Sequence, residues 1–283
     1  IVMKMNFKGK KGDTVHIPAP TRGSASAKAA STAVTLIADT ETEVLVSINQ
    51  HFEYSRFIED IVEAQALNSL RQFYTADAGY ALAKQVDTSL IQLGRAFNGA
   101  TVGTNDYATS NTTTKAFIGS DGTTAYNSTS SNAAALTDAA IRRTIQRLDD
   151  NDTPMDGRFF VIPPSSRNTL MGLSRYTEQA FVGNGNAIRT GEIGQLYGIP
   201  VFTTSNADTG AGNSATDRIC LMGHKDSMVL VEQVGIRSQT QYKQDYLATL
   251  FTSDTLYGVK AMRTAATTGA ALSSSAFALA VPA

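Results

Sequence analysis

Alternating apolar and polar residues near the start of the chain predict a β-strand. Val15 and Ile17 share one face, and their neighbours are polar. Pro18 and Pro20 follow and cannot donate backbone hydrogen bonds, so this strand cannot be a central strand of a sheet. A second strand is predicted over 43–49, with three apolar residues on one face: Val44, Val46 and Ile48.

These two strands predict a long hairpin with a wide, polar tip. Residues 21–32 are rich in Ser, Ala and Gly and include Arg22 and Lys28. A two-stranded hairpin is at best marginally stable in water, so this one needs a surface to lie on, which a neighbouring subunit can supply. The basic segment 4–11 before the hairpin is either an extended arm or a frayed terminus.

From Tyr54 to Phe97 the apolar residues recur with a helical period. A first stripe comprises Ile58, Ile61, Val62 and Ala66 and continues with Leu70, Phe73 and Tyr74. Gly79 is expected to loosen the join to a second stripe. The second stripe predicts a long surface helix from five apolar residues spaced three or four apart: Leu82, Val86, Leu90, Leu93 and Phe97. Residues 99–135 are then rich in Ser, Thr, Asn and Gly, and so long a loop is either functional or covered.

Helices and strands alternate from Thr137 to Arg237, as in an α/β domain. Thr137 is the expected N-cap of a helix, and 159–162 is a short buried strand. That helix carries Arg142, Arg143 and Arg147, which form either a solvated basic face, the favoured interpretation, or a contact with an acidic neighbour or DNA. Further strands are expected at 199–202, 219–222 and 228–231. The end of the chain returns to extended segments at 242–250 and 256–262.

Composition favours a structural protein. Only 17% of the 283 residues are charged, and the formal net charge is -1. The low fraction of charged residues suggests that much of the surface faces other protein. A net charge close to zero argues against a protein that binds nucleic acid tightly. We expect no membrane span and no signal peptide, because no apolar run is long enough and none stands at the start.

No catalytic constellation is evident, so we expect no enzyme, no metal and no cofactor. Cys220, the single cysteine, lies in an apolar run and is expected to be buried rather than nucleophilic. His16, His51 and His224 are the only histidines, and no pair has the spacing of metal ligands. Phosphate-binding and nucleophile-elbow motifs are also missing from the sequence.

The order of these features resembles the HK97-fold major capsid proteins of tailed bacteriophages. The resemblance rests on a basic arm, a hairpin opening Gly12-Asp13-Thr14-Val15-His16-Ile17-Pro18, a long helix, an α/β domain and a closing strand over 256–260. The segment 191–202 looks like the stretch before a strand of the family's axial domain; its sequence is Gly-Glu-Ile-Gly-Gln-Leu-Tyr-Gly-Ile-Pro-Val-Phe. The chain is most similar to capsid proteins of short-tailed, T7-like phages.

The resemblance implies an α+β fold with an N-terminal arm, an E-loop β-hairpin, a peripheral P-domain with a long spine helix, and an α/β axial A-domain. On this chain the expected boundaries are 1–12 for the arm, 13–52 for the E-loop, 53–136 for the P-domain with the Ser/Thr-rich loop, 137–241 for the A-domain, and 242–283 for the return to the P-domain and the tail.

The resemblance also implies the partners. Such subunits form pentamers and hexamers that close into an icosahedral shell around packaged double-stranded DNA, which is enclosed without sequence-specific binding. A scaffold protein, a portal and a decoration protein are expected, with assembly in the bacterial cytoplasm, location in the virion capsid and no membrane partner. Some members link neighbours by a Lys–Asn isopeptide bond; Lys28 is the candidate donor, but no Asn or Glu partner can be matched to it.

Two sets of contact residues follow from the resemblance and the patterns. Contacts between subunits are predicted on the hairpin and the arm, at Arg22, Lys28, Val44, Val46, Ile48, Lys8, Lys10 and Lys11. A loop of small residues is predicted at the axis of the capsomer, at Gly183, Asn184, Gly185 and Asn186. The alternatives are an encapsulin-type nanocompartment shell of the same fold, a secreted adhesin or surface-layer protein, and, weakest, an enzyme.

Overall fold

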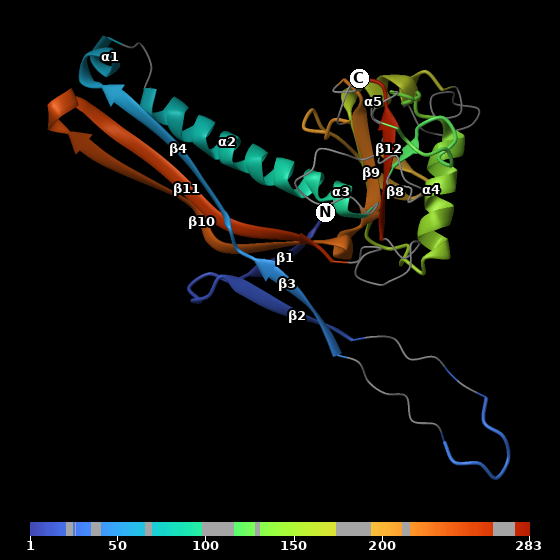
Figure 1. Cartoon of the computed structure of the whole chain (residues 1–283). Coiled ribbons are helices and arrows are strands. Elements are labelled where there is room, and N and C mark those ends of the chain that lie inside the picture. The colour runs from blue at the N-terminus through green and yellow to red at the C-terminus, as the bar shows by residue number, and fades with distance from the viewer. Residues whose placement is uncertain are drawn as a thin grey trace.

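The chain folds into two sheets joined at one end and a hairpin that leaves the junction (Figure 1). The computed structural model describes residues 1–20, 25, 27–34, 41–65, 70–97, 116–127, 131–173, 194–210, 216–262 and 275–283. Helices and strands both contribute, as expected for an α+β fold. No helix in these ranges is long and apolar enough to cross a membrane.

The first sheet has four strands and is unusually long. Its centre is an antiparallel pair, with β1 beside the first of the two strands in parallel orientation and β4 beside the second in antiparallel orientation. The strands, in spatial order, are β1 (Met3–Asn6), β10 (Met228–Lys243), β11 (Ala248–Ala261) and β4 (Gln50–Glu59). At 16 and 14 residues, β10 and β11 are far longer than the usual strand of about six.

A long helix, α2 (Leu70–Gln92), lies along one face of this sheet (Figure 1). Its Ala78 and Leu82 are buried, and Ala78 packs with Ile58 of β4 and Phe251 of β11. The helix runs through Gly79 without a break, contrary to the loose join expected there. Two short helices flank it, α1 (Asp60–Gln65) and α3 (Gly94–Phe97).

The prediction of a helix from Tyr54 onward was wrong for its first six residues. Residues 54–59 belong to β4, which pairs with β11 as far as Glu59 opposite Ala248. Ile58 is buried as a strand residue. The pairing partner lies about 190 positions later in the sequence, so the local period could not reveal it.

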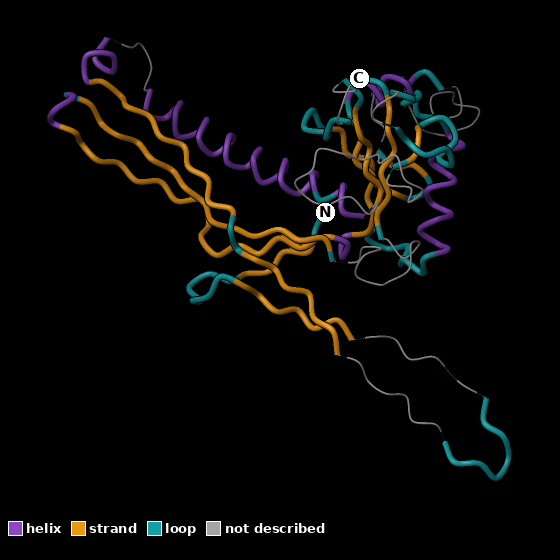
Figure 2. Tube along the Cα trace, viewed as in Figure 1, coloured by secondary structure: helices purple, strands orange, loops and turns teal. Residues whose placement is uncertain are grey.

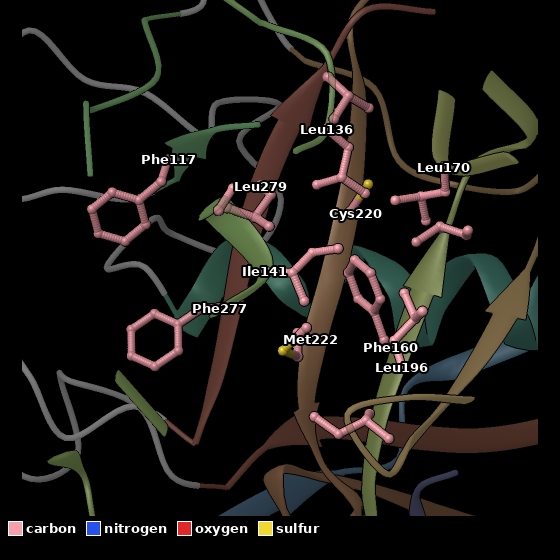
Figure 3. Packing of buried hydrophobic residues seen from close by; sticks show 14 of the residues in the cluster. Phe117, Leu136, Ile141, Phe160, Leu170, Leu196, Cys220, Met222, Phe277 and Leu279 are labelled. Carbon is pink, nitrogen blue, oxygen red and sulfur yellow. The ribbon is translucent and has the colours of Figure 1, made fainter. Parts of the chain in front are cut away.

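The second sheet has six strands and holds the main core. Its spatial order is β5 (Phe117–Ile118), β12 (Ala276–Val281), β9 (Arg218–His224), β6 (Arg158–Ile162), β8 (Ile199–Thr203) and β7 (Gln195–Leu196). Figure 3 shows Ile141 of α4 (Asp138–Asp150) among side chains of β6, β9 and β12. Leu170 of α5 (Pro164–Met171) belongs to the same core.

The start of α4 agrees with the sequence. Thr137 is the N-cap, and its side-chain oxygen accepts a hydrogen bond from the backbone N–H of Ala140 at 3.3 Å. Ile141 and Leu148 are fully buried on the apolar face. Phe160 and Ile162 of the predicted short strand are likewise inaccessible to solvent, and α5 begins with Pro164 in its first turn.

The hairpin of β2 (Thr14–Pro20) and β3 (Glu41–Ser47) confirms the two alternating strands. Val15 lies opposite Val46, and Ile17 lies opposite Val44. The base of the hairpin lies against β11 at Gly258, where an added Cβ would come within 2.5 Å of the carbonyl oxygen of Ser47. This glycine therefore permits a close crossing of backbone over backbone. The rest of the hairpin extends away from both sheets (Figure 2).

The structure places two strands in sheets that differ from those implied by the expected boundaries of the A-domain and the tail. The A-domain was expected to end at 241, but β10 belongs to the four-stranded sheet from Met228 onward. The tail was expected to return to the P-domain, but β12 lies between β5 and β9 in the six-stranded sheet. All six residues of β12 are buried, as befits an apolar strand covered on both faces. A single 3-10 turn, η1 (Lys225–Ser227), carries the chain from one sheet to the other.

A buried ion pair joins α3 to the segment that follows β8. Nε and Nη2 of Arg95 donate to the two carboxylate oxygens of Asp208, each at 2.7 Å. Both side chains are at least 94% buried. The bidentate geometry satisfies charges that would otherwise be costly at this depth.

We predict that Arg95→Met will lower the free energy of unfolding by about 3 to 5 kcal/mol, because it leaves the Asp208 carboxylate buried without its cation. Chemical denaturation followed by circular dichroism measures this loss. Arg142→Gln is the matched control: it removes an arginine that pairs with Asp138 at the surface, so stability should hardly change. Equal effects of the two substitutions would contradict the role assigned to Arg95.

Candidate assembly surfaces

The three apolar residues predicted as contacts, two in β3 and one just after it, are buried within this chain. Val44, Val46 and Ile48 are 6%, 0% and 7% exposed. Val46 and Ile48 pack with Val229 and Val231 of β10. They therefore anchor the base of the hairpin within this chain, and contacts from them to another copy remain a prediction.

The tip of the hairpin presents its side chains to solvent. Every described residue of the tip, at 25 and 27–34, is exposed, including Lys28 and the apolar Val34 at 70%. Figure 2 places this loop at the far end from both sheets. Arg22 lies outside the described residues. A long projection with so little apolar cover of its own is suited to lie on another molecule.

The basic arm is tied to the four-stranded sheet. Lys4 and Lys8 both pair with Glu232 of β10, at 2.5 and 3.0 Å, and the hydrogen bond from Lys4 is the main cause that lowers the pKa of Glu232. Lys10 lies 5.6 Å from the ring centre of Phe7. Lys8 is thus paired with a carboxylate of its own chain, and Lys8, Lys10 and Lys11 are all exposed.

An exposed apolar cluster covers the distal end of the four-stranded sheet. It gathers β4, α1, the start of α2 and the turn η2 (Gln244–Tyr246) that joins β10 to β11 (Figure 1). We call it the tip cluster; its members and exposed fractions are Phe57 (53%), Ile61 (63%), Val62 (48%), Phe73 (64%), Tyr246 (68%) and Leu247 (67%). The rings of Phe57 and Tyr246 lie 5.4 Å apart.

The sequence pattern placed Ile61, Val62 and Phe73 on the apolar stripe of a helix. An exposed surface at these positions was therefore not predicted. The structure buries no residue of α1. Several large apolar side chains left exposed at one end of a molecule are typical of a surface that meets another protein. No local signal in the sequence separates these positions from a buried stripe, because apolar residues can be covered by their own chain or by another.

The predicted axis loop, Gly183, Asn184, Gly185 and Asn186, lies outside the described residues. The structure describes the chain before and after this loop: α5 ends at Met171 and β7 begins at Gln195. No feature of the structure tests the placement of this loop.

The described residues offer no arrangement typical of a catalytic or metal site. No group of three metal-binding side chains occurs among them. Burial raises the pKa of Cys220 to about 12, and its sulfur lies 3.4 Å from the hydroxyl of Ser166. His16 pairs with Glu43 at 2.8 Å on the exposed hairpin, and His51 pairs with Asp254 at 3.3 Å. Buried His224 lies 2.7 Å from the carbonyl oxygen of Asp156.

The comparisons with known proteins agree on one family. A family model described as phage capsid protein matches residues 6–267. No curated protein sequence matches the chain significantly.

Solved structures share the fold over nearly the whole chain. The capsid of cyanophage P-SCSP1u has 19% sequence identity and a TM-score of 0.70, with 99% of this chain and 86% of that chain covered. Cyanophage Pam1 capsid has 15% identity and a TM-score of 0.70, with 99% and 88% covered. Mycobacterium phage Che8 has 20% identity and a TM-score of 0.69, with 95% and 85% covered.

We predict that Cys220 in the native protein will resist thiol reagents. At pH 8 a thiol with a pKa of about 12 is ionised in roughly one molecule in ten thousand, and only the thiolate reacts. Ellman's reagent added to native protein and to protein unfolded in urea measures the two rates. Similar rates in both states would contradict the burial of this residue.

We predict that Ile61→Asp with Phe73→Ser will weaken self-association without unfolding the subunit. Both side chains are mostly exposed in the single chain, so only a partner can bury them. Losing even one such contact should raise the concentration needed for association at least about tenfold. Sedimentation velocity measures this.

Met171→Ser, an exposed apolar position on α5, is the control and should leave association unchanged. A double variant that associates like the unmodified chain would rule out the tip cluster as a contact surface.

Proposed function

The chain belongs to the phage capsid protein family and is a major capsid protein that forms the viral shell; from this we propose that copies close into pentamers and hexamers around the double-stranded DNA of a tailed phage. The comparisons lend no support to a nanocompartment shell or a secreted adhesin. As a structural protein it is proposed to act without catalysis, through contacts between copies.

The observation that carries the proposal is the surface that a single copy leaves uncovered. The hairpin tip and the tip cluster lie at opposite ends of the molecule (Figure 1). Each is exposed in one chain, and each can be buried by a neighbour. A subunit with separate contact surfaces can join several neighbours, and many moderate contacts together give a stable closed shell.

The three parts of the fold suit different roles in a shell subunit. We assign the hairpin to the E-loop, the four-stranded sheet with α2 to the P-domain, and the six-stranded sheet to the A-domain. The long, stiff sheet and helix act as a spacer between contacts at the tip cluster and contacts near the capsomer axis. Arg22, Lys28, Lys10 and Lys11 are proposed to meet acidic groups of adjacent copies.

Net charge supports enclosure rather than tight binding of the genome. At a formal charge of -1 the subunit has no net positive charge to attract the phosphates of DNA. DNA can therefore enter and leave without adhering to the wall. A scaffold protein, a portal and a decoration protein are further proposed partners, with assembly in the host cytoplasm and the virion as the final location.

We predict that deletion of residues 21–32 will leave soluble, folded subunits that form no shells, because the hairpin loses its reach over the neighbour while its base stays anchored at Val46 and Ile48. Negative-stain microscopy scores the particles, and circular dichroism checks the fold. The control replaces 21–32 by a Gly/Ser segment of equal length, which separates loss of length from loss of side chains. Normal particles from the deletion would reject the proposed role of the hairpin.

A further inference from the structure

The distal half of β10 has no neighbouring strand along one border. β1 pairs with β10 only as far as Asn6 opposite Glu232. Beyond that point β10 continues to Lys243 and, among the described strands, pairs with β11 alone. Figure 1 shows this part of β10 along the border of the sheet opposite β4. Alternate residues of such an edge strand turn their backbone N–H and C=O groups outward, so a row of hydrogen-bonding groups there is open to another strand.

The side chains along this border are open to solvent on both faces of the sheet. All seven residues of the segment 236–242 are exposed, whereas the neighbouring strand β11 consists almost entirely of buried and half-buried positions. Ile236 and Tyr242, at the two ends of the segment, are 51% and 48% exposed. The segment 236–242, which we call the β10 border, therefore has the cover of one strand and exposes apolar as well as polar surface.

The β10 border lacks the usual features that keep exposed edge strands from pairing, which are proline, lysine and β-bulges. It contains neither Pro nor Lys. The register shifts of β10 lie before Arg237, and its pairing with β11 is regular from Arg237 to Lys243. The charge of Arg237 is matched by both carboxylate oxygens of Asp254, at 2.7 and 2.8 Å. By contrast, β2 of the hairpin carries two prolines. The β10 border is therefore free to accept a further strand.

The sequence of the β10 border is complementary to itself in the antiparallel direction. Two copies that pair over all seven exposed residues place Gln239 opposite Gln239. The other cross-strand pairs are then Ile236 with Tyr242, Arg237 with Gln241, and Ser238 with Thr240. A β-branched residue opposite an aromatic one and a hydroxyl opposite a hydroxyl are favourable cross-strand pairs, and no like charges face each other in this register. The composition of the border therefore points to a second copy of the same border as its partner.

A pairing of this kind also suits the wall of a shell. Antiparallel strands of identical copies are related by a twofold axis perpendicular to their sheet, so α2 lies on the same side of the sheet in both copies. A closed shell needs its subunits to turn the same face inward. The β10 border leads directly into η2 and the exposed Tyr246 and Leu247, so the contact is continuous with the tip cluster.

We propose that the β10 border pairs antiparallel with the β10 border of a second copy of this chain, about a twofold axis at Gln239. The two four-stranded sheets then form one continuous sheet across the contact, and hydrogen bonds between the two main chains hold the copies together. The contact is isologous, because the same residues lie on both of its sides. The inference rests on the proposed function and names one of the contacts between copies.

The test places charges at the proposed axis. Gln239 is exposed, so the variants Gln239→Glu and Gln239→Lys should both fold. Each variant alone puts like charges directly opposite each other and should raise the concentration needed for shell assembly about tenfold or more. An equal mixture of the two variants puts opposite charges there, and its assembly should return to within about threefold of the unmodified chain.

Light scattering against protein concentration measures assembly, and thermal unfolding verifies that each variant is folded. Rescue in the mixture requires that position 239 of one copy face position 239 of another. A mixture that assembles no better than either variant alone would therefore overturn the proposal, and so would single variants that assemble like the unmodified chain.

A cross-link identifies the partner strand. Gln239→Cys should form disulfide-linked dimers on oxidation, because residues directly opposite each other in an antiparallel pair have Cβ atoms about 5 Å apart. The single native cysteine, Cys220, is buried and does not compete. Ser55→Cys, at an exposed position of β4, is the matched control and should stay monomeric under the same oxidation.

Disulfides between positions 239 and 55 in a mixture of the two variants, identified by mass spectrometry of peptides, would assign the β10 border to β4 of another copy and overturn the proposal. Dimers of Gln239→Cys in a chain that never forms shells would instead uphold the pairing and reject the proposed function.

Discussion

The antiparallel pairing of β10 with β11 is the interaction on which the rest of the molecule depends. It runs from Met228 opposite Ala261 to Lys243 opposite Ala248. One end of the pair touches the six-stranded sheet through η1, and the other end forms the turn of the tip cluster. β1 and β4 pair along its two edges, and α2 lies on its face. Interrupting this ladder would separate the tip from the core and remove the surface on which the hairpin base rests.

A shape built on one long ladder has a large surface for its number of residues. The six-stranded sheet buries whole side chains from α4, α5 and all six of its strands, as a domain core does. Among the described residues, α2 covers the distal part of the four-stranded sheet, and the buried apolar residues there are few: Ile58, Ala78, Ala248 and Phe251. The described residues of the hairpin beyond its base add no core cluster of their own. The stability of these outer parts therefore depends on neighbours, which explains why a shell protein can leave them so open.

Local patterns predicted those elements whose signals are local. The alternation of Val44, Val46 and Ile48, the cap at Thr137 and the apolar run around Cys220 each report a nearby environment, and the structure confirms all three. Residues 54–59 were placed in a helix because their apolar spacing fits both periods, and only the distant β11 decides between them. The sheet membership of β10 and β12 is likewise a matter of long-range pairing. The tip cluster was not predicted, because a stripe of apolar residues has the same sequence pattern whether its own chain or another chain buries it.

Arginine illustrates how one side chain serves two purposes in this fold. Arg95 meets Asp208 with both donors of its fork in a dry interior, so that pair is complete within one chain. Arg143 and Arg147 lie on α4, where Asp138 pairs with Arg142 and Asp149 pairs with Arg158. One donor of Arg143 and one of Arg147 are buried and have no hydrogen-bond partner among the described residues. The guanidinium of Arg147 instead packs on the ring of Phe117 in β5, 3.2 Å from its centre. A long side chain of this kind stabilises the fold by covering apolar surface as well as by its charge, so arginine serves α4 through packing and α3 through a complete ion pair.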